Sequence, residues 1–357
     1  MTAATLTPRT PAPASAPAKA PGGLIRTMLR LHRWALWLWV AYVALFTGLL
    51  LWAWTTMGDD TQALLASCEP GNAPYLRCPK ELEDVWSVYD TLLRLGLYAI
   101  VAAPFLAGAW ASASLTAREL ETGTAELAWT QSVSPARWLT AKLAVPAVAV
   151  GAGIALLLAV YRPVAAAGVD VRDVVWYGGA PQWWSEDFFT AMGVVAVPRA
   201  LCAVAVGALL GFLLRRSLAS LGTGLLLMTA GTVTFALGRH RLWPSETRLG
   251  YAADEPSPRW DAFAGEWPLD SGAVTGSGEH VAYDYDCLDA VLGDDGRAGD
   301  AGDFYACLKA DGYSDVWASY HPKSHYWPLQ LVESGIWLAV AALAVFLSYR
   351  VLRRRTA

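Results

Sequence analysis

The sequence predicts an all-α polytopic membrane protein. It has six transmembrane helices, a cytoplasmic helix hairpin after the second helix, and a larger extracytoplasmic domain between helices 5 and 6. Of the 357 residues, 55% are hydrophobic and only 16% are charged, whereas soluble domains average about 45–50% and about 25%. The apolar residues are gathered into six blocks of 19 to 27 residues. Because a helix needs about 20 apolar residues to cross a bilayer, a soluble fold is excluded.

The six blocks are the predicted spans, and they hold almost no charge. They comprise residues 34–58, 95–117, 143–161, 188–214, 217–238 and 326–349. Arg199 and Glu333 are the only charged residues within them. An unpaired charge inside a membrane costs several kcal/mol, and each of these two lies in the outer half of its span. We therefore expect Arg199 and Glu333 to form an intramembrane pair.

The charged residues are sorted between the two sides of the spans. Fourteen Lys and Arg lie in four short segments, and 27 of the 31 acidic residues lie in the three other polar segments, 55–93, 162–189 and 240–326. Because Lys and Arg favour the cytoplasmic side, both termini are predicted to be cytoplasmic. The acidic large loop argues against nucleic-acid binding. The alanine-rich, lysine-poor composition is typical of bacteria, which favours a bacterial cell membrane.

The chain divides into four parts. Residues 1–23 are rich in Pro and Ala and predict a disordered cytoplasmic tail. Residues 24–239 form the membrane domain, whose first ten residues predict a short helix lying on the inner leaflet. Residues 240–326 form the extracytoplasmic domain. Residues 327–357 contain helix 6 and a basic cytoplasmic tail.

The cysteines are placed consistently with this topology. Cys68 and Cys78 lie in the first outer loop, Cys287 and Cys307 lie in the largest one, and Cys202 alone lies within a span. Pairs confined to outer loops are typical of disulfides in an oxidising compartment. Four cysteines allow three pairings, and the local pairing, Cys68–Cys78 with Cys287–Cys307, closes the shortest loops. Free thiols that fall outside by chance are the alternative.

The sequence contains no catalytic constellation. It has no GxxxxGK[ST] phosphate loop, no HExxH and no GxSxG motif, so we expect a non-catalytic protein without a cofactor. The Asp residues of the large loop do not have calcium-loop spacing and are more typical of a solvated acidic surface. His321 and His325 have no third ligand at a recognisable spacing, so no metal site is predicted.

One cytoplasmic segment has an unusual pattern. Residues 117–142 place Leu120, Thr124 and Leu127 on one helix face, with Gly123 in the middle of that helix. Ser134 followed by Pro135 is typical of a helix start, and this second helix continues into the third span. The pattern predicts a compact helix–turn–helix, for which a simple structured loop is the alternative.

This segment resembles the cytoplasmic signature of type-2 ABC transporter permeases, particularly those from actinobacteria. The matching features are acidic residues, an E-x-G-T sequence, a Leu four residues after the Gly, a helix break with Ser, and then Arg and Lys before the third span. In this sequence they are Glu119, Glu121, Gly123, Thr124, Leu127, Ser134, Arg137 and Lys142. Six spans and two cytoplasmic termini agree with the same family. The family's frequent Pro shortly after the Leu is replaced here by Trp129 and Thr130.

The resemblance implies a permease subunit of an ABC exporter. Such a subunit forms the transmembrane pathway, lies among membrane lipid, forms a homodimer or a heterodimer with a second permease, and uses ATP hydrolysis by a separate ABC ATPase subunit. Residues 117–142 would then be the coupling segment that docks on the ATPase. The alternative is a membrane sensor or receptor that signals through the same segment. A neighbouring gene for an ATPase would favour the permease hypothesis, and a neighbouring gene for a kinase would favour the sensor hypothesis.

Overall fold

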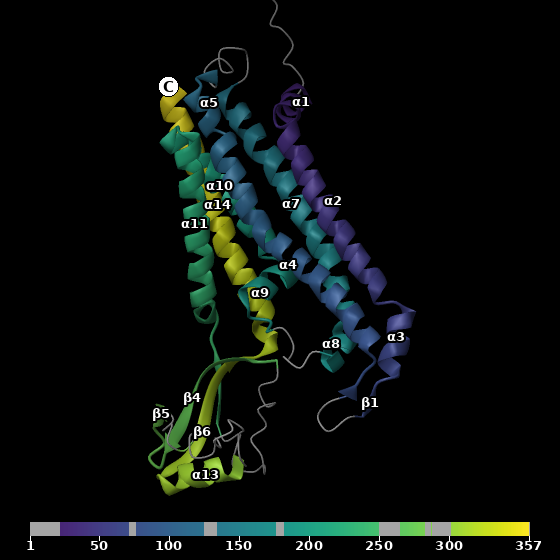
Figure 1. The fold of residues 1–357 in the computed structure, drawn as a ribbon. Helices are drawn as coiled ribbons and strands as arrows, with labels where there is room; N and C mark the ends of the chain where they lie inside the picture. Colours follow the sequence, from purple (N-terminus) through teal and green to yellow (C-terminus); the bar gives the residue numbers. More distant parts are fainter. Residues whose placement is uncertain are drawn as a thin grey trace, which may run out of the picture.

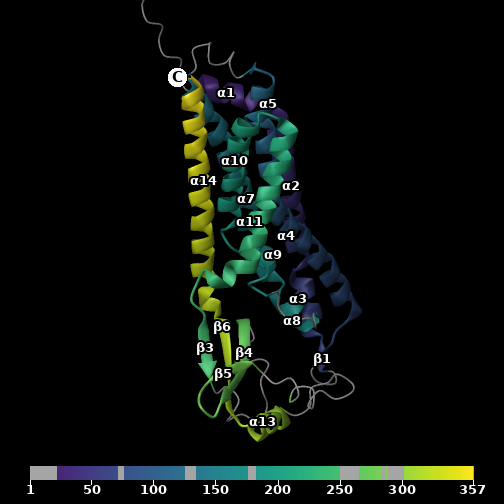
Figure 2. The same ribbon diagram turned by 90° about the vertical axis from the view of Figure 1, so that its left-hand side faces the viewer.

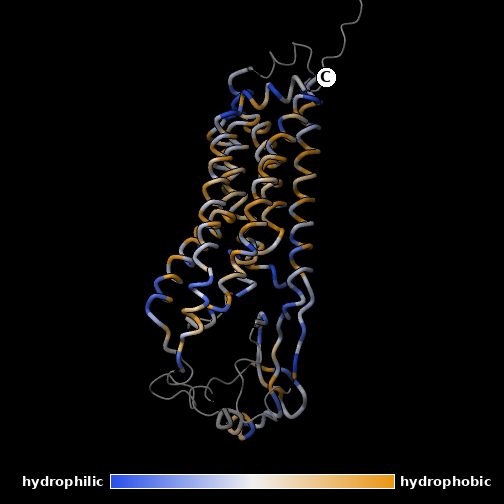
Figure 3. Tube along the Cα trace, turned by 90° about the vertical axis from the view of Figure 1, so that its right-hand side faces the viewer, coloured by the Kyte–Doolittle hydropathy of each residue, from blue (hydrophilic) through white to orange (hydrophobic). Residues whose placement is uncertain are grey.

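The computed structural model describes residues 22–70, 76–124, 134–175, 182–249, 265–282, 287 and 301–356. Within these ranges, six helices are long and apolar enough to cross a membrane. They are α2 (Arg33–Thr56), α4 (Lys80–Ser114), α7 (Pro135–Ala167), α10 (Ala196–Leu214), α11 (Ser217–Gly238) and α14 (Tyr326–Thr356). They form one bundle (Figure 1), along which hydrophobic residues predominate (Figure 3). The chain is therefore a multi-pass membrane protein.

Shorter helices lie at the two ends of this bundle. At one end, here called the terminal face, α1 (Gly22–Leu31) and α5 (Ala117–Glu121) lie near the C-terminus (Figures 1 and 2). The opposite end, here called the sheet face, carries the other short helices. These are α3 (Asp59–Ala66), α8 (Val169–Val175), α9 (Glu186–Met192), α13 (Ala301–Ala310) and the 3₁₀ helices η1 (Arg239–Arg241) and η3 (Lys323–His325).

The prediction of an all-α protein is wrong for residues 240–326. Four antiparallel strands form a sheet in the order β3-β6-β4-β5, which extends from the sheet face (Figure 2). They are β3 (Glu246–Leu249), β4 (Trp267–Thr275), β5 (His280–Ala282) and β6 (Tyr313–His321). Val316, Ala318 and Tyr320 of β6 are buried on one face, which is the two-residue period of a strand. A short ladder also joins β1 (Glu69–Pro70) to β2 (Leu76–Arg77).

Small residues bring α4, α10 and α11 close together in the middle of the bundle. A Cβ atom added at Gly207 of α10 would lie 2.8 Å from the backbone nitrogen of Ser112 in α4, and one added at Gly108 would lie 3.0 Å from Ala203 Cβ. At Gly224 of α11, an added Cβ would lie 2.3 Å from Ser112 Oγ. Close backbone approach of this kind is how membrane helices gain packing contacts.

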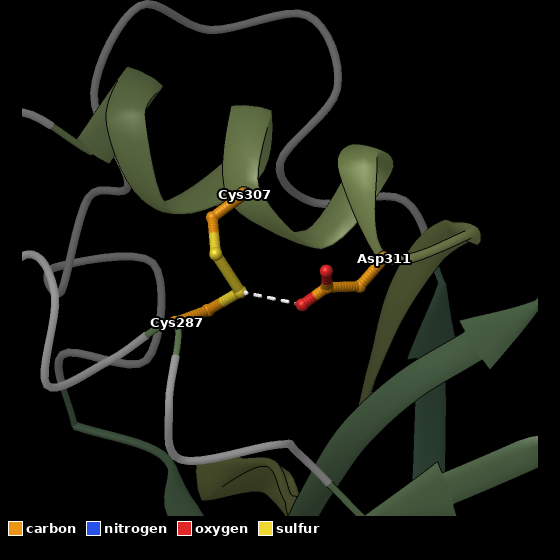
Figure 4. A group of neighbouring side chains, drawn as sticks. All are labelled: Cys287, Cys307 and Asp311. Carbon is orange, nitrogen blue, oxygen red and sulfur yellow. Dashed lines mark hydrogen bonds between the residues drawn. A yellow bond between two sulfur atoms is a disulfide. The ribbon is translucent and has the colours of Figure 1, made fainter.

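Both cysteine pairs lie at disulfide distance. Cys68 and Cys78 are joined with a sulfur–sulfur distance of 2.15 Å, and Cys287 and Cys307 with one of 2.00 Å. The second pair attaches α13 to the chain before it, and Asp311 Oδ2 lies 3.2 Å from Cys287 Sγ (Figure 4). This is the one group of three potential metal-ligand side chains among the described residues. Its sulfur atoms are bonded to each other and do not offer two thiolates.

Candidate functional site

The segment after α4 is attached to the bundle by a buried hydroxyl. Thr116 follows the end of α4 and is fully buried. Its Oγ1 donates a hydrogen bond of 2.8 Å to the carbonyl oxygen of Ala208 in α10. The absence of a side chain at Gly211 makes room for this contact, because a Cβ there would lie 2.7 Å from the backbone nitrogen of Ala117. The start of α5 is therefore held against α10.

A buried ion pair attaches α5 to α7. Lys142 Nζ lies 2.6 Å from Glu119 Oε1, and the Lys142 side chain has an exposed fraction of 0%. The same ammonium group donates to the carbonyl oxygen of Leu115 at 2.5 Å and lies 4.8 Å from the centre of the Trp138 ring. A buried ammonium group requires a counter-charge. Glu119 therefore points into the protein, where it neutralises Lys142.

A second carboxylate attaches α5 to α11. Glu121 Oε2 accepts a 3.0 Å hydrogen bond from the backbone nitrogen of Ser217, and it also accepts one from Ser217 Oγ. Ser217 is the first residue of α11, and a negative charge at a helix N-terminus is favourable. Glu121 itself is exposed. Its carboxylate joins α5 to the tight turn between α10 and α11.

The predicted helix through Gly123 is wrong. The α5 helix ends at Glu121, and Gly123 adopts φ +72°, a left-handed conformation that favours glycine. The turn at this position therefore favours glycine over residues that have a side chain. Thr124 is exposed beyond it. Leu127 lies outside the described residues, so the hairpin is described only at its two ends.

The second helix of the segment begins where the sequence predicts. Ser134 is the N-cap of α7, Pro135 is its first residue, and Ser134 Oγ accepts a 3.4 Å hydrogen bond from the backbone nitrogen of Arg137. Arg137 is exposed, as is Arg118 on α5. Of the sequence-predicted residues, Glu119 and Lys142 therefore face the interior, whereas Thr124 and Arg137 face outward. Arg118, which was not among the predicted residues, also faces outward.

His32, between α1 and α2, lies beside the buried Lys142. Burial lowers the pKa of His32 to about 4, and the charge of Lys142 lowers that pKa further in the same direction. The ring makes an edge-on contact with Trp110, with 5.5 Å between the ring centres. His32 is therefore neutral at pH 7 and adds no second positive charge to the Lys142 site.

Near the sheet face, the structure brings Arg199 and Glu333 together. Arg199 Nη2 lies 2.8 Å from Glu333 Oε1, and both side chains have an exposed fraction of 0%. Glu333 Oε1 also accepts a 3.3 Å hydrogen bond from Trp337 Nε1. An arginine of α10 is thereby joined to a glutamate of α14.

This pair is half of a ring of four charged residues. The other two members were not predicted from the sequence. Glu186 Oε1 lies 2.7 Å from Arg199 Nη1, and Glu186 Oε2 lies 2.5 Å from Arg239 Nη2. Arg239 Nε closes the ring at 2.9 Å from Glu333 Oε2. The ring has two positive and two negative charges and is neutral. It joins α9, α10, η1 and α14, and we call it the ionic ring.

The sequence contained a signal for each missed member. Arg239 is the first charged residue after the uncharged fifth block, and Glu186 lies in an aromatic segment beside Trp183 and Trp184. Both positions are at the boundary of a span, where charges are ordinary. Only the fold shows that these two boundaries meet.

Comparison with known protein families matches residues 40–239 to the family described as ABC-2 membrane transporter related. The matched range runs from within α2 to the first residue of η1 and includes α5, the Glu119–Lys142 pair and three members of the ionic ring. The sheet and α14 lie beyond it. No curated protein and no solved structure matches the chain.

Proposed function

Because the family match covers more than half of the chain's length, the chain belongs to the family of ABC-2 membrane transporter related proteins, and we propose that it is the permease subunit of an ABC exporter. A transporter permease role follows from the family. Export as the direction, a separate ATPase subunit as the energy source, and assembly with a second permease, identical or different, are our proposals.

The proposal that α5 is the coupling element is supported by its attachment to three spans. Thr116 joins it to α10, Glu119 to α7 and Glu121 to α11. A force applied to α5 would therefore be passed to three transmembrane helices, whereas an unattached loop would absorb it. This attachment is the single observation that carries the proposal.

We infer that the ATPase docks on the outward-facing residues of this segment. Arg118, Thr124 and Arg137 are exposed, whereas Glu119 is already neutralised by Lys142. Because the chain has no phosphate loop, ATP hydrolysis is assigned to the partner. The terminal face would then be cytoplasmic and the sheet extracytoplasmic in a bacterial cell membrane, in agreement with the basic residues near the chain ends.

Photo-cross-linking from Thr124 in native membranes tests the docking proposal. A photoreactive amino acid at this exposed position should form an adduct with a protein that contains a GxxxxGK[ST] loop, identified by mass spectrometry. The matched control carries the same amino acid at Ser324, which is exposed at the sheet face, and it should give no such adduct. An adduct with a kinase at Thr124 would contradict the proposal and favour the sensor reading.

A further inference from the structure

Two histidines meet where the sheet joins α14. His321 is the last residue of β6, and His325 ends η3 directly before α14 begins. Their Nδ1 atoms lie 3.0 Å apart, within hydrogen-bond distance. His321 is fully buried, whereas the His325 side chain retains an exposed fraction of 13%. The pair therefore connects the sheet to the last transmembrane helix and has access to solvent through His325.

The partner of the second nitrogen of His321 determines where its hydrogen lies. His321 Nε2 lies 2.9 Å from the carbonyl oxygen of His240 in η1. A carbonyl oxygen can only accept, so Nε2 carries a hydrogen. In a neutral imidazole, Nδ1 is then an acceptor. The hydrogen of the contact between the two Nδ1 atoms must consequently come from His325.

The second nitrogen of His325 faces a carboxylate. His325 Nε2 lies 3.4 Å from Glu246 Oε1 on β3. A neutral His325 that donates from Nδ1 would direct a lone pair at this negative oxygen. All three contacts are satisfied only when three hydrogens are distributed over the four ring nitrogens. Two neutral rings carry two hydrogens, so the arrangement requires one additional proton.

We propose that His321 and His325 form a proton-binding pair that shares one proton between their Nδ1 atoms and thereby attaches the sheet to α14 in a pH-dependent manner. Glu246 is the counter-charge. We call this arrangement the histidine clasp. It is independent of the transport proposal, because it depends only on contacts at the sheet face.

The charged groups around the clasp are consistent with a proton held on the His325 side. Burial is the main cause that lowers the pKa of His321, which keeps that ring neutral. On β3, Glu246 also accepts a 3.4 Å hydrogen bond from Tyr320 Oη. The other titratable and charged groups nearby are the His240 ring, which accepts from Arg241 Nε at 3.2 Å, Arg248 over the Tyr320 ring, and Lys323 of η3.

A proton fits this geometry better than a metal ion. Tetrahedral zinc bound to two imidazole nitrogens at about 2.0–2.1 Å holds them about 3.3 Å apart and needs further ligands. The two Nδ1 atoms are 3.0 Å apart. In the part of the chain that the structure describes, the groups of three potential ligand side chains do not include this pair.

The sign of the pH dependence follows from the bound proton. The three contacts of the folded pair require one proton more than two neutral rings carry, and the unfolded chain makes none of these contacts. The attachment is therefore complete at acidic pH, where the proton is bound, and weakens at alkaline pH, where it is released. Because His240 follows Arg239 of the ionic ring, loss of the clasp acts next to the ends of α11 and α14.

Two measurements on the full-length protein in lipid nanodiscs test the clasp. The chain has five histidines, so ¹⁵N labelling of their rings gives a simple spectrum. At pH 5.5 we expect one ring of the pair to carry hydrogen on both nitrogens. Hydrogen exchange of the β6 amides, corrected for intrinsic rates, should be about tenfold slower at pH 5.5 than at pH 8.5, because the protonated clasp holds the end of this strand.

Variants separate the clasp from general stability. His325→Gln should remove the pH dependence and leave the weaker protection at both pH values. His325→Lys supplies a permanent cation between His321 and Glu246 and should restore strong protection at both. The matched control is His280→Gln, because His280 on β5 stacks on Trp317 and not on the clasp. It should keep the wild-type pH dependence.

Three results would overturn the proposal. Neutral rings for both histidines at pH 5.5 would remove the shared proton. If the protection of the β6 amides from hydrogen exchange were independent of pH in the wild-type protein, the attachment of the sheet to α14 would not depend on pH. Protection that is lost on adding a chelator and restored by zinc at pH 8.5 would assign the pair to a metal ion instead.

Discussion

At the scale of single residues, the ionic ring is the most constrained feature of the membrane domain. Each of its four side chains contacts two members of opposite charge, at distances of 2.5 to 2.9 Å. Arg199 and Glu333 have no exposed surface at all. A charge left without its partner in such surroundings is expensive, so the ring is stable only when it is complete.

Replacing one member of the ring should therefore lower the free energy of unfolding by more than the loss of that residue's own contacts would. We expect Arg199→Ala to lower the free energy of unfolding by about 3–5 kcal/mol, because it leaves Glu333 and Glu186 sharing one arginine. The double variant Arg199→Ala/Glu333→Ala should cost clearly less than the sum of the two single changes. Chemical unfolding in detergent micelles measures both quantities.

The control is an ion pair of similar length in an exposed position. Arg94 Nε lies 2.7 Å from Asp90 Oδ2, with side-chain exposed fractions of 51% and 24%. The change Asp90→Ala should cost about 1 kcal/mol or less. Strictly additive effects of Arg199→Ala and Glu333→Ala would show that the two side chains do not interact in the membrane.

Two of the four residues of the ionic ring were predictable from the sequence. Arg199 and Glu333 are recognisable because each is the only charge in a long apolar block. Glu186 and Arg239 lie at block boundaries, where a charge needs no explanation, and their convergence depends on how α9 and η1 are placed. The inward orientation of Glu119 was missed for a similar reason. A glutamate in a polar segment gives no indication that a buried lysine 23 positions later will neutralise it.

At the scale of elements, the contact between α4 and α10 depends on small residues. Alanine and glycine recur every four residues on both helices, in Ala103, Ala107 and Ala111 and in Ala203, Gly207 and Gly211. In so alanine-rich a sequence, the spacing alone could not be separated from coincidence. The structure gives it a role, since Gly207 lies against Ser112 and Gly108 against Ala203.

A methyl group at this contact should separate the helices. We expect Gly207→Ala to destabilise the protein by about 1–3 kcal/mol, because the new Cβ would lie 2.8 Å from a backbone nitrogen that cannot move freely. Gly222→Ala on α11 is the matched control, since no atom lies within 4 Å of a Cβ there. Thermal unfolding in nanodiscs distinguishes the two. Equal stability of both variants would contradict the close approach.

The disulfides belong to the same scale, because each closes a loop that includes a short element or part of one. Cys68 precedes β1 and Cys78 precedes α4, while Cys307 lies on α13. Peptide mapping without reduction should recover Cys68 joined to Cys78 and Cys287 joined to Cys307. Each closed loop should contribute about 3 kcal/mol by restricting the unfolded chain. Four free thiols in the mature protein would contradict the pairing. Cys202, which is free and buried, should react with alkylating reagents only after unfolding and so provides an internal control.

The four-stranded sheet could not be predicted from the hydrophobic pattern of the sequence, whereas the spans could. The spans were predictable because block length alone identifies a membrane helix. In residues 240–326, the alternation of buried residues in β6 extends over a single strand. β3 and β4 pair with β6 across long separations, whereas β5 forms a local hairpin with β4. Strand pairing of that kind is not encoded in local periodicity.

At the scale of the whole molecule, the bundle has a different kind of connection at each end. At the sheet face, the ionic ring holds α9, α10, η1 and α14 together. At the terminal face, α5 is held to α7, α10 and α11. Because α10 takes part in both, a displacement of α5 would reach the sheet face through one continuous helix. This is the mechanical basis of the coupling that we propose.

Charge reversal on the terminal face tests this central claim most directly. The double variant Arg118→Glu/Arg137→Glu changes two exposed residues of the coupling segment and leaves the buried Glu119–Lys142 pair intact. Lys323→Glu makes the same kind of change at the exposed sheet face and is the matched control. The measurement is the amount of ATPase that co-purifies with the chain from native membranes, beside the thermal stability of each variant. We expect the double variant to insert with unchanged stability and to lose most of the ATPase, while Lys323→Glu retains it. Undiminished ATPase on the double variant would contradict docking through residues 117–142.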